Sequence, residues 1–346
     1  MKIYKNVFEK IISSENLFAA WDKFRSDKQK KRDVCEFEWE LEKNIFELHR
    51  DLVNKRYKHG AHTSFFIHDP KRRHIHKAIV RDRVLHHAIF NILNPIFEPT
   101  FIANSYSCRI GYGTHTGVDA LDSFIRKTSQ NYTKPCYVLK CDIKKFFDSV
   151  NHEILFSILK RRIKDKDALC LLQEIIESYV SAERGRKGIP IGNLTSQLFA
   201  NIYMNEFDQF VKHEWKVKYY ARYTDDFIIV GPNREGLDGY LPRIIEFLDK
   251  KLALALHPNK VSIRKFHQGV DFLGYVTLPH HKLLRSKTKG RIFRKLRMRV
   301  REYKSGVITK QTLEQSLQSY LGVLSHANAY ELSQELLSQY WFWIGD

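Results

Sequence analysis

The sequence predicts an α+β fold, in which helices and β-strands alternate without the regular strand–helix–strand repeat of a parallel sheet. Two observations support this prediction. Apolar residues recur at steps of three and four over several stretches, which is typical of amphipathic helices. Short β-prone runs lie between these stretches, and one pair of runs flanks a tight acidic turn, which indicates a hairpin. With 346 residues, the chain can hold two or three closely packed units.

The first sixty residues are predicted to be helical, and we assign 1–62 to an N-terminal helical extension. One apolar stripe at helical spacing consists of Phe37, Leu41, Ile45, Leu48 and Leu52. The pattern then changes to two short β-prone pieces, 64–67 and 73–76, which predict a hairpin. A helix follows, and we expect it to end before Pro95.

The middle of the chain contains two β-structures that carry acids. Residues 136–143 are predicted to form a buried strand with Asp142 near its end. Residues 218–230 form two β-prone runs around a turn with Asp225 and Asp226. Between them, Asn151 is expected to cap a helix. Both acidic sites therefore lie where strands end, and a shared sheet would bring them together.

The last part of the chain is strongly basic, with ten basic residues and one acid between 285 and 304. On a helix, the buried stripe would consist of Phe293, Leu296, Val300 and Tyr303. Arg294, Arg297 and Arg301 would line another face, where we expect contact with nucleic acid. Two further helices would complete a small basic helical unit at 285–346.

Composition points to nucleic acid as the partner, because the net charge of +19 attracts phosphate backbones. A membrane surface attracts the same charge, but no apolar run approaches the roughly 20 residues needed to span a bilayer. The N-terminus lacks the apolar core of a signal peptide. The five cysteines are scattered without a C-x-x-C pair, which argues against a zinc ribbon or a disulfide framework. We therefore expect a cytoplasmic protein that does not bind membranes.

The clustered acids suggest metal-dependent chemistry. Carboxylates brought together repel one another, and divalent cations are their natural counter-charge. Two Mg²⁺ ions about 3.5–4 Å apart can activate an attacking hydroxyl and stabilise a departing phosphate. Taken singly, Asp142 equally suits a turn or a helix cap, and Tyr-x-Asp-Asp is short enough to arise by chance. Together with the basic charge, the acids indicate a polymerase or a nuclease.

Several motifs stand in the order found in one enzyme family. Residues 141–150, Cys-Asp-Ile-Lys-Lys-Phe-Phe-Asp-Ser-Val, resemble the first acidic palm motif of reverse transcriptases, and 223–226, Tyr-Thr-Asp-Asp, resemble their Y-x-D-D box. The other blocks in family order are the loop around Arg109, 188–192 with Ser196 and Gln197, Lys260, and 270–275. The resemblance covers roughly 64–284. It implies a right-hand polymerase with fingers and palm at 63–284 and a small helical thumb at 285–346.

The resemblance also implies catalytic roles. Asp142 and Asp225 would hold two Mg²⁺ ions, for which Mn²⁺ could substitute, and Ile143 would add its backbone carbonyl. Asp226 matches the second acid of the box, whose contribution to metal binding is less direct. Lys260 resembles the lysine proposed to protonate departing pyrophosphate, and its alternative is a solvated lysine.

Nucleotide binding is implied by further positions. Phe147 matches the steric gate that a ribose 2′-hydroxyl would strike, which favours dNTPs; its alternative is a core phenylalanine. Arg109, Arg73 and Arg81 resemble positions that grip the incoming triphosphate, where a guanidinium fork suits phosphate oxygens. Arg73 and Arg81 could instead be surface charges. The primer grip would consist of Phe272, Leu273, Gly274 and Tyr275.

Two departures from the pattern of most reverse transcriptases indicate which subgroup of the family the sequence resembles. Ile191-Gly192 stands where most reverse transcriptases carry Gln-Gly, and Ser196-Gln197 stands where most carry Ser-Pro. This pattern resembles the reverse transcriptases of diversity-generating retroelements, whose copying of adenine is error-prone. Losing a glutamine amide beside the nucleotide would loosen base-pair checking. The implied partners are a structured noncoding or template RNA, the RNA–DNA duplex, dNTPs and a small basic accessory protein.

Two rival functions stay open. A defence-associated reverse transcriptase, making cDNA from its own noncoding RNA in response to phage, would share the same palm. An inactive RNA-binding scaffold would keep the fold, but the intact acids argue against it. The histidines at 68, 74, 76, 86 and 87 suggest stacking, phosphate contact or packing rather than a zinc site.

Overall fold

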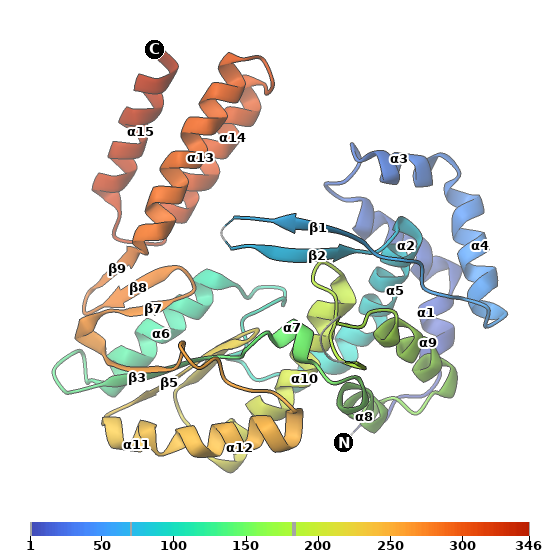
Figure 1. Cartoon of the computed structure of the whole chain (residues 1–346), viewed down its shortest axis with the longest axis horizontal. Coiled ribbons are helices and arrows are strands. Elements are labelled where there is room, and N and C mark those ends of the chain that lie inside the picture. The colour runs from blue at the N-terminus through green and yellow to red at the C-terminus, as the bar shows by residue number, and fades with distance from the viewer. Residues whose placement is uncertain (1, 70, 182–184, 346) are drawn as a thin grey trace.

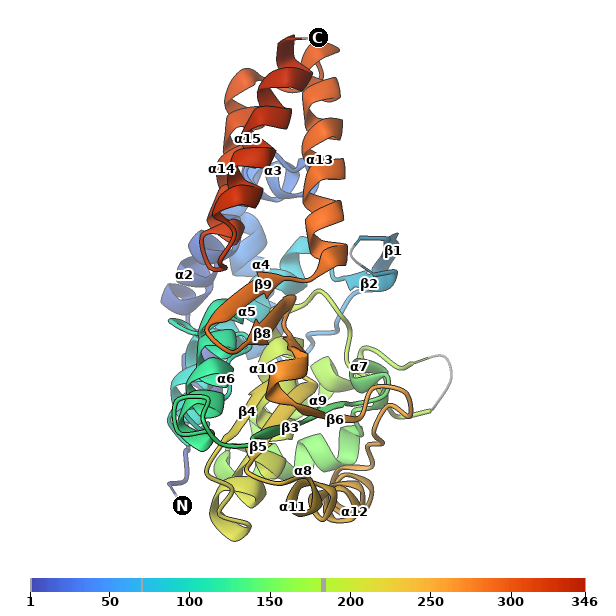
Figure 2. The same cartoon turned by 90° about the vertical axis from the view of Figure 1, so that its left-hand side faces the viewer.

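A computed structural model describes residues 2–69, 71–181 and 185–345 and confirms the α+β prediction. Within this described part of the chain, the strands form three antiparallel sheets of two, four and three strands. Figure 1 shows the sheets and most helices in one body, from which the three C-terminal helices extend. Figure 2 shows the same three helices standing above the rest of the molecule.

The N-terminal helices are α1 (Val7–Ile12), α2 (Ser14–Arg25), α3 (Arg32–Trp39) and α4 (Leu41–Val53). They share one hydrophobic core with the long helix α5 (Val80–Phe97) and with the central sheet. The predicted single stripe is divided between α3 and α4, because Glu40 has a non-helical backbone conformation. The expected end before Pro95 was wrong: α5 continues to Phe97, since Ile96 and Phe97 are buried and a proline in the last turn removes few hydrogen bonds.

The predicted hairpin is formed by β1 (Thr63–Ile67) and β2 (Arg73–Lys77). It projects from the N-terminal half of the molecule toward the C-terminal helices (Figure 1). At its tip, the carboxylate of Asp69 lies 2.8 Å from Lys295 Nζ, 3.9 Å from Arg294 and 4.0 Å from Arg291. The hairpin tip therefore touches the first C-terminal helix through ion pairs.

The central sheet has the strand order β4-β5-β3-β6. Its strands are β3 (Tyr137–Asp142), β4 (Tyr220–Tyr223), β5 (Asp226–Gly231) and β6 (Ser262–Lys265). One face packs on α6 (Thr114–Thr128), and the other packs on α10 (Leu194–Gln209) and α12 (Tyr240–Leu252). Period-two alternation along β3 and β5 explains why both faces carry apolar residues.

The remaining elements of this body are short or lie around the sheet and the N-terminal helices. They are η1 (Glu98–Thr100), α7 (Phe146–Ser149), α8 (His152–Arg162), α9 (Lys166–Glu177), the π-helical η2 (Phe210–Glu214), α11 (Arg234–Asp238) and η3 (Phe266–Gln268). The predicted cap of α8 is confirmed, because Asn151 Oδ1 accepts a hydrogen bond of 3.1 Å from the Ile154 N–H.

The C-terminal part begins with a three-stranded sheet, β7 (Val270–Phe272), β8 (Tyr275–Leu278) and β9 (His281–Leu284). It leads into α13 (Ser286–Lys304), α14 (Lys310–Leu324) and α15 (Tyr330–Gly345), which pack around a hydrophobic cluster of their own. The buried stripe of α13 is Ile292, Leu296 and Val300. Phe293 and Tyr303, predicted to belong to it, are only half-buried.

Candidate active site

The two acidic segments meet in the central sheet. Strands β3 and β5 are antiparallel neighbours, and Asp142 stands directly opposite Asp226 in their register. The Ile143 N–H donates a hydrogen bond of 3.2 Å to the backbone carbonyl of Asp225. The sheet therefore brings together the three acids that the sequence predicts for the site.

The carboxylates are poorly solvated and act on one another. Asp142 is buried, and its Oδ2 lies 2.7 Å from Lys260 Nζ. Burial raises the pKa of Asp225, and the charge of Asp142 raises it further. Burial also raises the pKa of Asp226 to about 6, with the neighbouring acids adding to the effect and the Lys140 ammonium opposing it. Negative charge is thus concentrated where strand β3 ends and strand β5 begins.

This negative charge suits a divalent cation, although the side chains of the acids are not positioned to coordinate one together. In the described residues, no group of three or more His, Cys, Asp or Glu side chains is placed to hold a metal ion. The donor atoms nevertheless fit: carboxylate and carbonyl oxygens are the ligands that Mg²⁺ prefers. The pKa values of Asp225 and Asp226 are raised, and a cation bound beside these carboxylates would lower them.

The turn that carries Asp225 is hydrogen-bonded to Arg222, a residue that the sequence analysis missed. Thr224 adopts a left-handed conformation with φ 54°, and its carbonyl accepts a hydrogen bond of 2.9 Å from Arg222 Nη1. Arg222 is completely buried and pairs with Asp208 of α10. Arg222 stands directly before the Tyr-x-Asp-Asp box, but a buried partner on a distant helix leaves no local signal in the sequence.

Phe147 lies on α7, close in sequence to Asp142, and packs edge-on against Phe146. Its backbone carbonyl accepts a hydrogen bond of 2.8 Å from the Ile189 N–H. This bond connects the predicted gate to the segment that contains Ile191 and Gly192. The side chain of Phe147 is half-buried and packs against the main hydrophobic core.

Ile191 and Gly192 contact the β1–β2 hairpin. The Ile191 carbonyl accepts a hydrogen bond of 3.0 Å from the His76 N–H. Gly192 has φ +118°, and a Cβ at this position would lie 2.9 Å from Ile75 Cγ2, so the position requires glycine. Gln197 is exposed on the first turn of α10.

The three predicted arginines have different surroundings. Arg73 is exposed on β2. Arg81 lies 3.2 Å from the Asp51 carboxylate and donates a hydrogen bond of 2.7 Å to the Lys58 carbonyl. The side chain of Arg109 is only 5% exposed; it pairs with Glu98 at 2.8 Å and donates to the carbonyls of Ile102 and Ser105 at 2.8 and 2.7 Å. In this structure Arg81 and Arg109 therefore hold protein segments together and do not present free guanidinium groups to a phosphate.

Lys71 is a further cation that the sequence analysis missed. It lies beside the hairpin tip, and its charge opposes the rise in the pKa of Asp225, as that of Lys260 does. The signal available in the sequence was the basic run at 71–73, which follows the predicted first strand of the hairpin.

The predicted primer-grip residues form the turn between β7 and β8. Phe272 and Tyr275 are buried, while Leu273 and Gly274 have positive φ values of 50° and 92°. The Tyr275 hydroxyl donates a hydrogen bond of 3.0 Å to the Val323 carbonyl on α14. This turn therefore joins the central body to the C-terminal helices.

The predicted nucleic-acid contacts on α13 are accessible. Arg294, Arg297 and Arg301 are exposed, and the Arg297 guanidinium lies 5.9 Å from the ring centre of Trp343.

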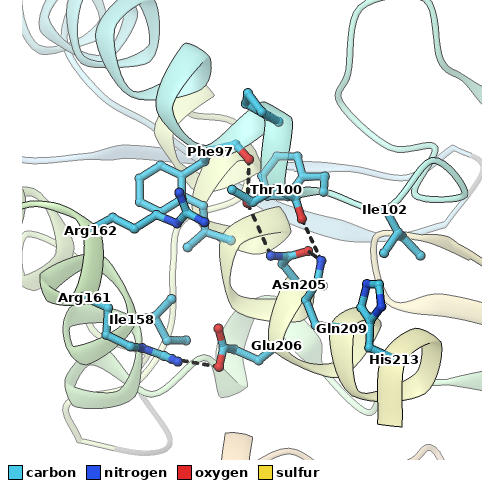
Figure 3. Close-up of a pocket in the computed structure, with 13 residues that line it drawn as sticks. Phe97, Thr100, Ile102, Ile158, Arg161, Arg162, Asn205, Glu206, Gln209 and His213 are labelled. Atoms are coloured by element: carbon cyan, nitrogen blue, oxygen red, sulfur yellow. Dashed lines mark hydrogen bonds and ion pairs between the residues drawn. The ribbon is translucent and has the colours of Figure 1, made fainter. Parts of the chain in front are cut away.

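A cavity of about 470 Å³ lies elsewhere, between α5, α8 and the C-terminal half of α10 (Figure 3). Several of its polar groups bind one another: Arg161 pairs with Glu206 at 2.8 Å, and Gln209 donates to the backbone carbonyl of Thr100 at 2.7 Å. None of the predicted site residues, all of which the structure describes, lines this cavity.

Comparisons with known proteins agree with the geometry. Residues 67–277, well over half of the chain, match the family described as "Reverse transcriptase (RNA-dependent DNA polymerase)". Protein YkfC of Escherichia coli (strain K12) is 26% identical over 246 residues, which cover 61% of this chain and 62% of that protein. The group II intron-encoded protein LtrA of Lactococcus lactis subsp. cremoris is 24% identical over 303 residues, covering 68% of this chain and 47% of that protein.

A solved structure shares the fold. Apo telomerase from Candida tropicalis, truncated from its C-terminal domain, superposes with a TM-score of 0.50 at 15% identity and covers 69% of this chain and 59% of that one. At this identity the similarity concerns the fold alone. The chain spans less than two thirds of the length of each of these three proteins. No helix in the described part of the chain has the length and apolar character to cross a membrane.

Proposed function

The chain belongs to the reverse transcriptase (RNA-dependent DNA polymerase) family, and from this premise we propose that it is an RNA-directed DNA polymerase that copies a structured RNA into cDNA. The observation that carries the proposal is the position of Asp142 opposite Asp226, with Asp225 at the adjoining turn. Three poorly solvated acids at one sheet edge, in a chain of net charge +19, suit phosphoryl transfer on nucleic acid.

In this proposal, Asp142, Asp225 and the Ile143 carbonyl hold two Mg²⁺ or Mn²⁺ ions, and Asp226 supports them from the neighbouring position. Bound divalent cations supply Lewis-acid stabilisation of the attacking and leaving oxygens. Lys260, whose ammonium lies 2.7 Å from Asp142, holds a proton close to the site and donates it to departing pyrophosphate.

The nucleotide and the primer are bound by the segments around the acids. Phe147 excludes a ribose 2′-hydroxyl, and Arg73 and Lys71 approach the triphosphate of a dNTP from the hairpin. Arg81 and Arg109 act indirectly, because they hold α5 and the loop at 105–109 in place. The 272–275 turn supports the primer end, and Arg294, Arg297 and Arg301 contact the RNA–DNA duplex along α13.

The test is primer extension by the purified protein on an RNA template with dNTPs and Mg²⁺. Asp225→Asn should abolish incorporation, because one metal-binding carboxylate is lost. Asp249→Asn, the same change at an exposed position on α12, should retain it. Failure to incorporate dNTPs under any template and metal tested would instead support an inactive RNA-binding scaffold.

We further propose that the cDNA serves a diversity-generating retroelement with error-prone copying of adenine, assisted by a small basic accessory protein. The supporting observation is Ile191, an aliphatic side chain without an amide beside the Phe147 segment. Ordinary error rates opposite adenine, in wild type and in Ile191→Gln alike, would exclude this role. The alternative role is phage defence with cDNA made from the enzyme's own noncoding RNA, which sequencing of the copurifying RNA would reveal.

A further inference from the structure

The loop between η1 and α6 is hydrogen-bonded to β4 and reaches the acidic turn. Ser105 forms a parallel β-bridge with Arg222. In this bridge the Arg222 N–H donates a hydrogen bond of 2.9 Å to the Asn104 carbonyl, and the Tyr106 N–H donates one of 2.9 Å to the Arg222 carbonyl. The next residue of the loop, Ser107, is buried and contacts the turn between β4 and β5. The loop is therefore attached to the central sheet at the point where the acids stand.

The acidic turn begins with a residue in a strained conformation. In the register of β4 and β5, Tyr223 stands opposite Asp226, so Thr224 and Asp225 form a two-residue hairpin loop. Of these two, only Thr224 has a positive φ, of 54°. This pattern is that of a type II′ turn, whose first central position normally holds glycine. A β-branched residue very rarely adopts a positive φ, and it does so only where surrounding contacts hold it there.

Four hydrogen bonds around Thr224 form a closed cycle. The Thr224 hydroxyl donates to Ser107 Oγ at 2.6 Å, and the Thr224 carbonyl accepts from Arg222 Nη1 at 2.9 Å. Asn201 of α10 completes the cycle, because its Nδ2 donates to the Ser107 carbonyl at 2.8 Å and its Oδ1 accepts from Arg222 Nη1 at 3.4 Å. Ser107, Asn201 and Arg222 are all buried. Buried groups thus hold the strained residue by both its side chain and its backbone.

The cycle acts on Asp225 through the peptide that joins it to Thr224. The Thr224 carbonyl and the Asp225 N–H belong to one planar peptide, so a contact that fixes the carbonyl also fixes the N–H. On the other side, the Asp225 carbonyl accepts a hydrogen bond of 3.2 Å from the Ile143 N–H, just after β3. Contacts that hold a metal-binding side chain in place strengthen metal binding. The Asp225 backbone is therefore held from both sides in the position where its carboxylate can meet a cation.

The Ser107 hydroxyl interacts mainly with Thr224. Its other polar neighbour in the described part of the chain is Cys108 Sγ at 3.3 Å, and a thiol is a weak hydrogen-bonding group. The contact of 2.6 Å with the Thr224 hydroxyl is much shorter. Loss of either hydroxyl would therefore remove the same side-chain link between the loop and the acidic turn.

We propose that Ser107 and Thr224 are positioning residues of the polymerase: their hydroxyl pair holds the acidic turn so that Asp225 is in place to bind the divalent cation. The inference rests on the proposed function, because that function assigns Asp225 to the cation. It adds that a loop outside the strands of the central sheet decides how tightly the cation binds.

The first measurement is the Kd for Mn²⁺, determined by electron paramagnetic resonance on the full chain without nucleic acid or dNTPs. Thr224→Val keeps the shape of the side chain but removes its hydroxyl. Thr224→Val and Ser107→Ala should each raise the Kd roughly 2- to 10-fold, as for the loss of one hydrogen bond. The double variant should bind no more weakly than either single variant, because both substitutions remove the same bond. Thr224→Ser keeps the hydroxyl and should retain the wild-type Kd.

Ser129→Ala is the matched control for a general loss of stability. Ser129 is completely buried at the C-terminal end of α6, and its Oγ accepts a hydrogen bond of 2.8 Å from the Tyr132 N–H. This variant should unfold at a lower temperature than wild type but bind Mn²⁺ with the wild-type Kd. Thr224 is only half-buried, so Thr224→Val supplies the measurement if Ser107→Ala does not fold.

Primer extension gives a second readout. Because the hydroxyl pair acts on cation binding, Thr224→Val should raise the Mg²⁺ concentration for half-maximal rate. At saturating Mg²⁺ the rate should approach that of wild type, and the KM for dNTPs should not change. A rate that stays low at every Mg²⁺ concentration would contradict the proposed role in positioning Asp225.

The Mn²⁺ measurement can overturn the inference in three ways. The Kd would be the same in wild type, Thr224→Val and Ser107→Ala; or Ser129→Ala would weaken binding as much; or wild type would show no Mn²⁺ binding that Asp225→Asn removes. Additive effects of the two substitutions would equally contradict a shared bond. Because this assay involves no catalysis, a chain that binds Mn²⁺ through Asp225 but incorporates no dNTP would contradict the polymerase proposal alone.

Discussion

Arg222 and Asp208 form an ion pair in which both side chains are completely buried, with Nη2 and Oδ2 2.6 Å apart. The Tyr220 hydroxyl donates a further hydrogen bond of 2.7 Å to Asp208. Arg222 also donates to the Thr224 carbonyl at 2.9 Å and to Ser105 Oγ at 3.0 Å. One guanidinium thus connects α10, the loop at 105 and the turn that positions Asp225.

Breaking this pair should destabilise the protein strongly. Asp208→Asn leaves a buried guanidinium without its counter-charge, and we expect the free energy of unfolding in urea to fall by about 3–5 kcal/mol. Glu206→Gln on the same helix is the matched control. It breaks the partly exposed pair with Arg161 and should cost about 1 kcal/mol or less. Equal losses in the two variants would contradict the role assigned to Arg222.

Asp165 should make stability depend on acid pH. Its Oδ2 accepts from the Val7 and Phe8 N–H groups at 2.7 and 2.8 Å, and its Oδ1 accepts from Asp167 and Ala168 at 3.1 Å each. Burial alone would raise the pKa of Asp165, but these four donors outweigh it and hold the pKa below its ordinary value. Because the folded state binds the proton less tightly, the charged carboxylate stabilises the fold at neutral pH.

The measurement is the unfolding free energy of wild type and Asp165→Asn at several pH values. At pH 7 the variant should be less stable by about 1–2 kcal/mol, as for the loss of a good helix cap. The difference should shrink as the pH falls below about 4 and the wild-type carboxylate is protonated. A difference that is constant with pH would show that the charge of Asp165 plays no part.

Lys260→Gln should separate proton donation from metal binding. We expect the rate of nucleotide incorporation to fall by about 100-fold or more, as for loss of a general acid. The Mg²⁺ concentration for half-maximal rate should not rise, because Asp142 loses a cation that competes for its oxygen. Lys251→Gln, an exposed lysine on α12, should behave like wild type. A higher Mg²⁺ requirement with an unchanged rate would contradict this assignment.

Gly192→Ala should disturb the contact between the hairpin and the segment at 189–192. A Cβ at Gly192 combines an unfavourable φ of +118° with a separation of 2.9 Å from Ile75 Cγ2, and we expect a loss of about 1–3 kcal/mol together with slower primer extension. Gly111→Ala is the stability control, because φ there is +79° but no atom would lie within 4 Å of the added Cβ. Ile75→Ala removes the clashing atom and should restore part of the loss in a Gly192→Ala background.

Local features of the fold could be predicted because their causes are local. The spacing of apolar residues predicted α13, Asn151 capped α8 as expected, and the β-prone runs predicted the β1–β2 hairpin and the acidic turn. The end of α5 was missed because burial of Ile96 and Phe97, a tertiary effect, outweighs the cost of Pro95.

The features of the candidate site likewise fall into those that the sequence could predict and those that depend on tertiary packing. The sequence by itself determined the acids, the gate candidate Phe147 and the family, since these depend on residue identity and order. Only the tertiary structure decided that Asp142 faces Asp226, that Arg222 is buried with Asp208, and that Arg81 and Arg109 bind protein atoms. Strand register and side-chain partners in other helices, strands or loops decide these points, and both depend on how separate segments of the chain pack together.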